Sequence, residues 1–154
     1  MSQSKQTNHK KIRVVLADDH AVLRMGIRSL LNQSEDIQVI GEASTGVEAI
    51  RAVKDLKPDV LLLDMEMPEM DGVEVTRRLQ EEKAPVRILV LSAYNDREYI
   101  QETLEMGVAG YLIKDEAPSS IVDAVRGVAR GQQGWLSRKV SQQLNYRHTQ
   151  TLAS

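Results

Sequence analysis

The sequence contains no cysteine. This excludes a disulfide framework, a thiolate metal site and a thiol nucleophile, and it agrees with a reducing compartment. Long apolar runs are also missing, because the longest, such as residues 60–63 and 88–91, have only the length of a β-strand. Residues 1–11 are polar and do not form a secretory signal. We therefore expect a cytoplasmic protein without a membrane segment.

An excess of charge of one sign is missing as well. The formal net charge is -2, from 20 basic and 22 acidic residues that are interspersed along the chain. Such a sequence has no electrostatic footprint for nucleic acid, so contact with DNA would need another domain. Apolar residues make up 42% and charged residues 27% of the 154 residues, which is typical of one globular domain.

Short apolar runs alternate with segments of helical periodicity over residues 12–130, which predicts repeated βα units and a parallel sheet. The predicted strands cover residues 12–17, 37–43, 60–63, 86–91 and 110–113. Most of these runs are apolar throughout, so we expect helices on both faces of the sheet. The second run alternates apolar and polar residues, which favours an edge strand.

The helical segments carry recognisable start and stop residues. Leu23, Ile27 and Leu30 form one apolar stripe of the first helix. Gly107 fits the end of the fourth helix, and the fifth is predicted from near Pro118 to Gly131. The spacing of a capping box predicts the starts of helices two to four, at Thr45 with Glu48, Asp71 with Glu74, and Asn95 with Glu98.

Three segments follow from this pattern. We interpret residues 1–11 as a flexible N-terminal tail, residues 12–130 as one domain, and residues 131–154 as a linker or tail. Ser137 is a candidate cap for one further short helix toward Leu144.

Polar residues follow four of the five predicted strands, where the carboxyl ends of parallel strands meet at one edge of a sheet. Three aspartates at close quarters repel one another, so this array needs a cation, and oxygen ligands favour Mg²⁺. Asp64 is then placed to be a nucleophile, while a lysine and a serine suit the oxygens of a phosphoryl group. The residues are Asp18 and Asp19 after the first strand, Asp64 and then Glu66 after the third, Ser92 after the fourth, and Lys114 after the fifth.

Each of these residues also has a simpler interpretation. Asp18 or Asp19 alone is most often a helix cap, Asp64 a turn residue and Lys114 a solvated surface lysine. Their joint placement after four strands favours a site over coincidence. His20 is interpreted as the first residue of a helix, and the sequence shows no histidine cluster.

Four segments together resemble the receiver domain of two-component response regulators: Asp18-Asp19, residues 61–72 (LLLDMEMPEMDG), Ser92-Ala93 and residues 111–114 (YLIK). The resemblance covers residues 12–130. It implies a flavodoxin-like α/β fold, with a doubly wound five-stranded parallel sheet of order 2-1-3-4-5 and helices on both faces.

The resemblance also implies roles for the site. Asp64 would be the phosphoacceptor, which takes a phosphoryl group from a phosphohistidine of a sensor histidine kinase. Asp19 and Asp64 would ligate Mg²⁺ directly, the backbone carbonyl of Glu66 would be a third ligand, and Asp18 would act through water. Lys114 would pair with the phosphoryl group.

The resemblance also implies a conformational switch and residues that set the lifetime of the phosphorylated form. Ser92 would move to bind the phosphoryl group and Tyr111 would swing inward, which biases a two-state surface. Glu66 and Tyr94 flank the site and would tune how fast water removes the phosphoryl group. The protein would be a regulator rather than an enzyme, with only self-phosphorylation from small donors and self-dephosphorylation.

Finer features resemble the nitrate-regulator or LuxR-like (NarL/FixJ) branch, in which a helix-turn-helix domain follows the receiver: residues 18–20 (DDH), 24–26 (RMG), 114–118 (KDEAP) and 134–137 (GWLS). We expect an excised receiver that forms a phosphorylation-dependent homodimer and reaches DNA only through a C-terminal domain absent from this chain. A stand-alone single-domain regulator is the alternative.

Three other classes fit less well. A Mg²⁺-dependent hydrolase of the haloacid-dehalogenase type needs an aspartate two positions after the nucleophile, and Glu66 stands there. A flavodoxin-like cofactor binder needs phosphate-binding amides and hydroxyls in the first loop, which instead begins Asp18-Asp19 and repels anions. An inactive scaffold of the same fold is disfavoured because every expected site residue is present.

Overall fold

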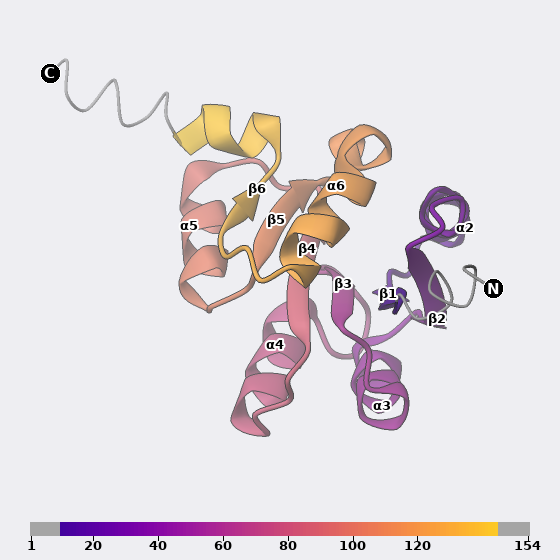
Figure 1. Cartoon of the computed structure of the whole chain (residues 1–154). Helices are drawn as coiled ribbons and strands as arrows, with labels where there is room; N and C mark the ends of the chain where they lie inside the picture. Colours follow the sequence, from indigo (N-terminus) through magenta and orange to yellow (C-terminus); the bar gives the residue numbers. More distant parts are fainter. Residues whose placement is uncertain (1–9, 145–154) are drawn as a thin grey trace, which may run out of the picture.

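The computed structural model describes residues 10–144 and shows a parallel β-sheet between two layers of helices (Figure 1). In these residues the sheet has six strands in the order β2-β1-β3-β4-β5-β6. The strands are β1 (Ile12–Ala17), β2 (Ile37–Ala43), β3 (Val60–Asp64), β4 (Arg87–Ser92), β5 (Gly110–Ile113) and β6 (Trp135–Leu136). The helices are α2 (Ala21–Asn32), α3 (Gly46–Leu56), α4 (Gly72–Glu81), α5 (Arg97–Glu105), the short 3₁₀ helix η1 (Lys114–Glu116) and α6 (Ala117–Ala129).

The strands form at the apolar runs of the sequence, as predicted. β1, β2 and β5 have the predicted bounds, β3 extends one residue further to Asp64, and β4 begins and ends one residue later than expected. β2 lies at the edge of the sheet, as its alternating pattern indicated. The predicted order 2-1-3-4-5 is confirmed for the first five strands.

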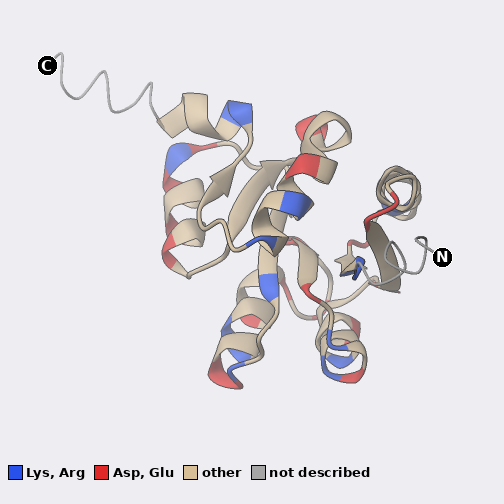
Figure 2. Ribbon diagram, in the orientation of Figure 1, with Lys and Arg blue, Asp and Glu red and all other residues tan. Residues whose placement is uncertain are grey.

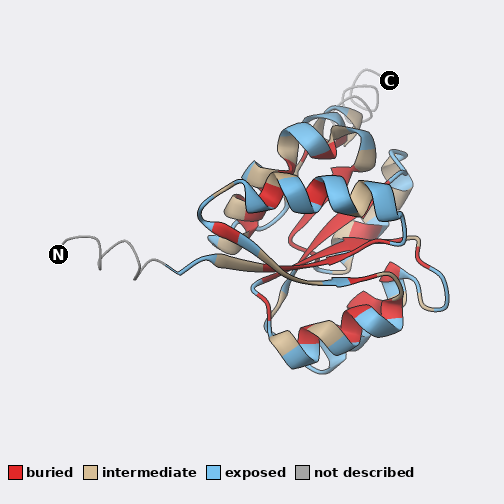
Figure 3. Ribbon diagram, turned by 90° about the vertical axis from the view of Figure 1, so that its right-hand side faces the viewer, coloured by how far each residue is buried: buried red, intermediate tan, exposed pale blue. Residues whose placement is uncertain are grey.

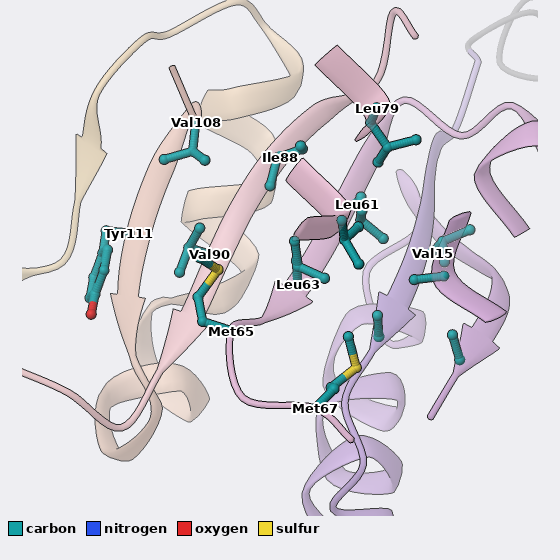
Figure 4. Packing of buried hydrophobic residues seen from close by; sticks show 14 of the residues in the cluster. Val15, Leu61, Leu63, Met65, Met67, Leu79, Ile88, Val90, Val108 and Tyr111 are labelled. Carbon is teal, nitrogen blue, oxygen red and sulfur yellow. The ribbon is translucent and has the colours of Figure 1, made fainter. Parts of the chain in front are cut away.

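Helices cover both faces of the sheet, as the apolar strands predicted. α2 and α6 pack on one face, where Ile27 and Val125 are buried against the strands. α3, α4 and α5 pack on the other, and Figure 4 shows Val15, Leu61 and Val90 in a row across this face. Buried positions point toward the sheet and exposed positions toward solvent along each helix (Figure 3). The central strands are therefore kept away from water on both sides.

Two of the three helix starts predicted from capping-box spacing are confirmed. The side chain of Thr45 accepts a hydrogen bond from the Glu48 N–H, and Asp71 accepts one from the Glu74 N–H. The third prediction was wrong by one residue, because Asp96 rather than Asn95 caps α5 by accepting from the Tyr99 N–H. Gly107 has a φ of 90°, as expected for a left-handed helix stop.

The five-stranded sheet of the sequence analysis needs a correction, because residues 135–136 add a sixth strand beside β5. The Trp135 N–H donates to the Ala109 carbonyl at 2.9 Å. Gly110 makes this approach possible, since a Cβ there would lie 2.6 Å from the Trp135 carbonyl oxygen. Two residues are too few to show a period of two in the sequence, so the strand could not be seen there.

The predicted short helix is present from residue 138, and its described part runs to residue 144. Ser137 precedes it, but its Oγ makes no hydrogen bond, so the predicted side-chain cap was wrong. Val140 is fully buried and belongs to the same core cluster as Tyr111. The Lys139 Nζ lies 2.9 Å from Asp115 Oδ2 and ties this helix to η1. The predicted division into tail, domain and linker stays a prediction, and residues 1–9 and 145–154 lie outside the described part.

Acidic and basic residues are interspersed over the helices (Figure 2), as the sequence indicated. Arg126 of α6 donates from Nε and NH2 to both carboxylate oxygens of Asp36, at 2.9 and 3.0 Å. This hydrogen bond lowers the pKa of Asp36. The ion pair fixes α6 against the turn before β2.

We expect Val140→Ala to lower the free energy of unfolding by about 2 kcal/mol, because it removes two buried methyl groups and leaves a small cavity. Gln142→Ala, at an exposed position of the same helix, is the matched control and should change stability by less than about 0.5 kcal/mol. Urea denaturation measures both. Equal stabilities of the two variants would contradict the packing of this helix into the core.

Candidate phosphoryl-transfer site

The strand ends bring the predicted site residues to one edge of the sheet. Asp64 and Ser92 are the last residues of β3 and β4, while Asp18 and Lys114 directly follow β1 and β5. The register pairs Ala17 with Leu63, Asp64 with Leu91, and Ser92 with Ile113, so the four strands end at one level. Residues that are nearly a hundred positions apart in the sequence therefore share one site, as predicted.

Asp64 lies at the floor of the site and is fully buried. Its Oδ1 accepts a hydrogen bond from the Glu66 N–H at 3.0 Å, and its Oδ2 lies 3.1 Å from the Lys114 Nζ. Burial raises the pKa of the Asp64 carboxyl to about 6, and the charge of Asp18 adds to this, while the Glu66 N–H and Lys114 oppose it. Gly72 lets α4 begin close to this loop, because a Cβ there would lie 2.7 Å from the Met65 Cα.

Asp18 is also fully buried. Its Oδ1 accepts from the His20 N–H at 2.7 Å, while its Oδ2 lies 3.5 Å from the Lys114 Nζ and has no hydrogen-bond partner. His20 is the residue that precedes α2, so this bond does not cap a helical N–H. The interpretation of Asp18 as an ordinary helix cap is therefore not supported.

The acidic residues fit a divalent cation. Within residues 10–144, Asp18, Asp19, His20 and Asp64 each offer one ligand atom, and these atoms all lie within 4.8 Å of one another. Asp18 Oδ2 and Asp64 Oδ2 are buried, with the Lys114 Nζ 3.5 and 3.1 Å away. Hard carboxylate oxygens of this kind suit Mg²⁺, as the sequence predicted. Asp19 stands at the rim, with 33% of its side chain exposed.

His20 is the site residue that the sequence analysis missed. Its Nδ1 lies 3.0 Å from Asp18 Oδ1, 3.3 Å from Asp19 Oδ1 and 3.2 Å from the Lys114 Nζ. The prediction treated it as the first residue of a helix, whereas it is the residue before α2. The sequence signal that could have assigned His20 to the site is its position directly after two aspartates at the end of a strand.

Ser92, Tyr94 and Tyr111 form one hydrogen-bonded group beside Asp64. The Tyr94 N–H donates to Ser92 Oγ at 3.0 Å, and the Tyr111 hydroxyl donates to the Tyr94 carbonyl at 2.8 Å. Tyr111 is fully buried, which raises its pKa. Figure 4 shows its ring beside β5. The backbone of Tyr94 is therefore held from both sides.

The Tyr94 side chain extends from this group toward Glu66, beside the site. Its side chain is exposed, and Glu66 beside its hydroxyl raises the pKa of the phenol. The rings of Tyr94 and Tyr99 meet edge to face with centroids 4.9 Å apart. Glu66 thus contacts the site through its backbone N–H and Tyr94 through its side chain. Its carbonyl as a metal ligand stays a prediction.

The sequence of residues 14–126 matches the family described as the response regulator receiver domain. The chain belongs to this family. Within the described residues no helix is long and apolar enough to cross a membrane.

Named relatives place the receiver among transcriptional regulators. The transcriptional regulatory protein LiaR of Bacillus subtilis (strain 168) is 40% identical over 121 residues, which are 79% of this chain and 57% of LiaR. The chain thus spans little more than half the length of this relative. The homologues are transcriptional regulators of the NarL/LuxR type.

Solved structures agree with this assignment. The receiver domain of NarL from Mycobacterium tuberculosis is 39% identical with a TM-score of 0.77, covering 80% of this chain and 99% of that one. The receiver domain of RcsB from Salmonella enterica serovar Typhimurium, solved with the phosphomimetic BeF₃⁻, is 26% identical with a TM-score of 0.80, covering 87% and 99%. RcsB has also been solved as two dimers bound to two parallel DNAs, at 27% identity and a TM-score of 0.81, covering 88% and 69%.

We expect Asp64→Asn to raise the free energy of unfolding by about 2 kcal/mol at pH 7.5 without divalent cations. The upward shift of two pKa units corresponds to roughly 3 kcal/mol of destabilisation by the ionised carboxylate, and the loss of this carboxylate as a partner of Lys114 offsets part of the gain. The folded pKa of about 6 lies above the unfolded value. The free energy of unfolding of the parent receiver therefore falls as the pH rises from about 4 to about 6, because Asp64 loses its proton in the buried site.

The gain of Asp64→Asn should accordingly shrink toward zero as the pH falls to about 4. Urea denaturation across this pH range tests it, and Asp55→Asn, at an exposed carboxylate of α3, is the control. A gain of the same size at both ends of the range would contradict the burial penalty.

Proposed function

We propose that Asp64 of this receiver accepts a phosphoryl group from a phosphohistidine of a sensor histidine kinase. The observation that carries the proposal is the Asp64 carboxylate itself, which is buried, lies 3.1 Å from an ammonium and has the carboxylates of Asp18 and Asp19 beside it, within reach of a shared metal ion. The Glu66 N–H holds Oδ1 and so orients the carboxylate. The family match and the phosphomimetic complex of the RcsB receiver support the same chemistry.

The transfer is a displacement at phosphorus. An Asp64 oxygen forms the new P–O bond while the P–N bond to the donor histidine breaks, and the imidazole leaves with the bonding pair. Lys114 lies close enough to balance the charge of the transferred group. A divalent cation would be held by Asp19, Asp64 and the Glu66 carbonyl, with Asp18 acting through water, and it would supply Lewis-acid stabilisation of the phosphoryl oxygens.

The switch follows from the hydrogen bonds of Ser92. Its Oγ accepts from the Tyr94 N–H, which leaves its hydroxyl hydrogen free to bind a phosphoryl oxygen. Movement of Ser92 toward Asp64 pulls on Tyr94, and Tyr94 is bonded to Tyr111. Tyr111 is already buried and bonded to the Tyr94 carbonyl in this structure, so a bond from Ser92 to the phosphoryl group would stabilise this inward position further.

The effect of phosphorylation would be felt in a longer regulator, through its dimerisation or its DNA-binding domain. Relatives such as LiaR are transcriptional regulators of which the matched region is little more than half, and RcsB binds DNA as dimers. We infer that phosphorylation of Asp64 controls homodimerisation or an attached DNA-binding domain. The interspersed charges of this receiver fit a role in which it does not contact DNA itself.

We expect the chain to gain one phosphoryl group when it is incubated with Mg²⁺ and acetyl phosphate, because Asp64 is poised for attack. Intact mass spectrometry measures the gain. Asp64→Asn should show none, and Asp55→Asn should behave as the parent chain. Omission of Mg²⁺ should abolish the gain. Phosphorylation that persists in Asp64→Asn would refute the assignment, and sustained release of phosphate from many donor molecules would favour a hydrolase.

We expect Tyr94→Ala to lose the phosphoryl group about fivefold faster than the parent chain, a difference of about 1 kcal/mol in barrier, because the bulky ring beside Glu66 restricts the approach of water. Tyr94→Phe keeps the ring and should stay close to the parent rate. The measurement is intact mass against time after removal of the donor. Equal decay rates of Tyr94→Ala and the parent would refute the role of the ring.

A further inference from the structure

An apolar pocket lies at the amino ends of β3 and β4, at the opposite end of these strands from Asp64 and Ser92. It has a volume of about 370 Å³ and is formed by the last turn of α3 and the segments that lead into the two strands. Small-molecule sites typically have volumes of roughly 300–1,000 Å³. Its apolar lining consists of Val53, Pro58, Ala84, Pro85 and Val86.

The chemistry of this lining favours an aliphatic ligand. None of the five apolar side chains carries a hydrogen-bond donor or acceptor. Lys54 and Lys57 complete the lining, and the Lys54 Nζ is already paired with Glu82 Oε2 at 3.1 Å. A sugar or a nucleobase would leave polar groups unpaired against such walls, whereas an alkyl chain would not.

A second, basic pocket adjoins the apolar one, because Lys57, Pro58 and Pro85 line both. The basic pocket has a volume of about 420 Å³. Within residues 10–144, its four cationic side chains form no ion pair with a carboxylate. These side chains are Lys10, Lys11, Lys57 and Arg87.

The negative groups beside the basic pocket are already compensated by Arg13. Asp59, which also lines the pocket, accepts the Arg13 N–H at its Oδ2 at 2.8 Å. The Arg13 guanidinium donates to the Leu56 and Lys57 carbonyls at the end of α3, both at 2.7 Å. These carbonyls lie at the negative end of the helix dipole. The four cations are therefore available to hold an anion.

We propose that the two pockets together bind an anionic amphiphile, with its alkyl chain in the apolar pocket and its carboxylate or phosphate head among the four cations. The chain is stabilised by removal from water and the head by charge-assisted hydrogen bonds. Residues 1–9 and 145–154 contain no acidic side chain, so these segments do not supply the charge that the basic pocket fits. Because the pockets lie away from Asp64, the inference does not depend on phosphoryl transfer.

Titration calorimetry with decanoate, below its micelle concentration, tests the head-group contacts. The double variant Lys57→Asn/Arg87→Gln removes two of the four cations, and asparagine suits the left-handed conformation of Lys57, whose φ is 50°. We expect the parent chain to bind decanoate and the double variant to bind it at least about fivefold more weakly. Lys83→Asn is the matched control, because Lys83 has a φ of 56° and lines neither pocket. It should keep the parent affinity.

Two other ligands separate the contributions of the chain and the charge. Butyrate keeps the carboxylate but lacks most of the alkyl chain, and decyltrimethylammonium keeps the chain but reverses the charge. Each should bind the parent chain at least about tenfold more weakly than decanoate. Methyl NMR locates the chain: decanoate should shift the resonances of Val53 and Val86 and leave those of Leu23, on the other face of the sheet, unchanged.

Vesicles distinguish a free amphiphile from a membrane lipid as the natural source of the ligand. Sedimentation of the parent chain with phosphatidylglycerol vesicles, but not of the double variant, would assign the ligand to a bilayer. Decanoate binding without sedimentation would assign it to a free amphiphile.

Three results would overturn the proposal. They are no binding of decanoate by the parent chain, equal affinities of the parent chain and the double variant, and decyltrimethylammonium binding as tight as that of decanoate.

Discussion

Asp18 and Asp64 are two buried carboxylates that share the ammonium of Lys114. Burial of like charges is unfavourable, and it persists only where the surrounding fold supplies enough stability. The parallel sheet provides both parts of this arrangement. Its strands end together, which brings the carboxylates into one site, and its two helical layers keep the strands dry. The charge imbalance is what allows the site to respond to a cation or a phosphoryl group.

A conformational change at the site can reach other parts of the molecule, because the site residues also contact neighbouring elements. Lys114 opens η1, and the next residue, Asp115, pairs with Lys139. On the other side, Ser92 and Tyr111 both hold the backbone of Tyr94. A change at Asp64 therefore reaches two surfaces through short chains of contacts. Both paths end on the side of the sheet that carries β5 and β6.

Much of the fold could be predicted because its signals are local. Three strands have the predicted bounds since β-branched runs are flanked by polar residues, and the strand ends then place the site. Sequence reasoning failed where two adjacent residues can play the same role, or where the outcome depends on three-dimensional placement. Asn95 and Asp96 can both cap a helix, and only the structure separates them. The approach of His20 to three aspartates depends on the direction of its side chain, which spacing does not reveal.

The sixth strand has a consequence for how the sheet meets its surroundings. Without β6, the backbone of Gly110–Ile113 would form a bare edge of the sheet, with unpaired donors and acceptors open to strands of other molecules. Trp135–Leu136 pairs in parallel with Gly110 and Tyr111, so the outermost strand on this side is only two residues long. Very short edge strands offer little to strands of other molecules, so we expect a fragment that stops at Gly131, in which the longer β5 is the edge strand, to associate edge to edge more readily.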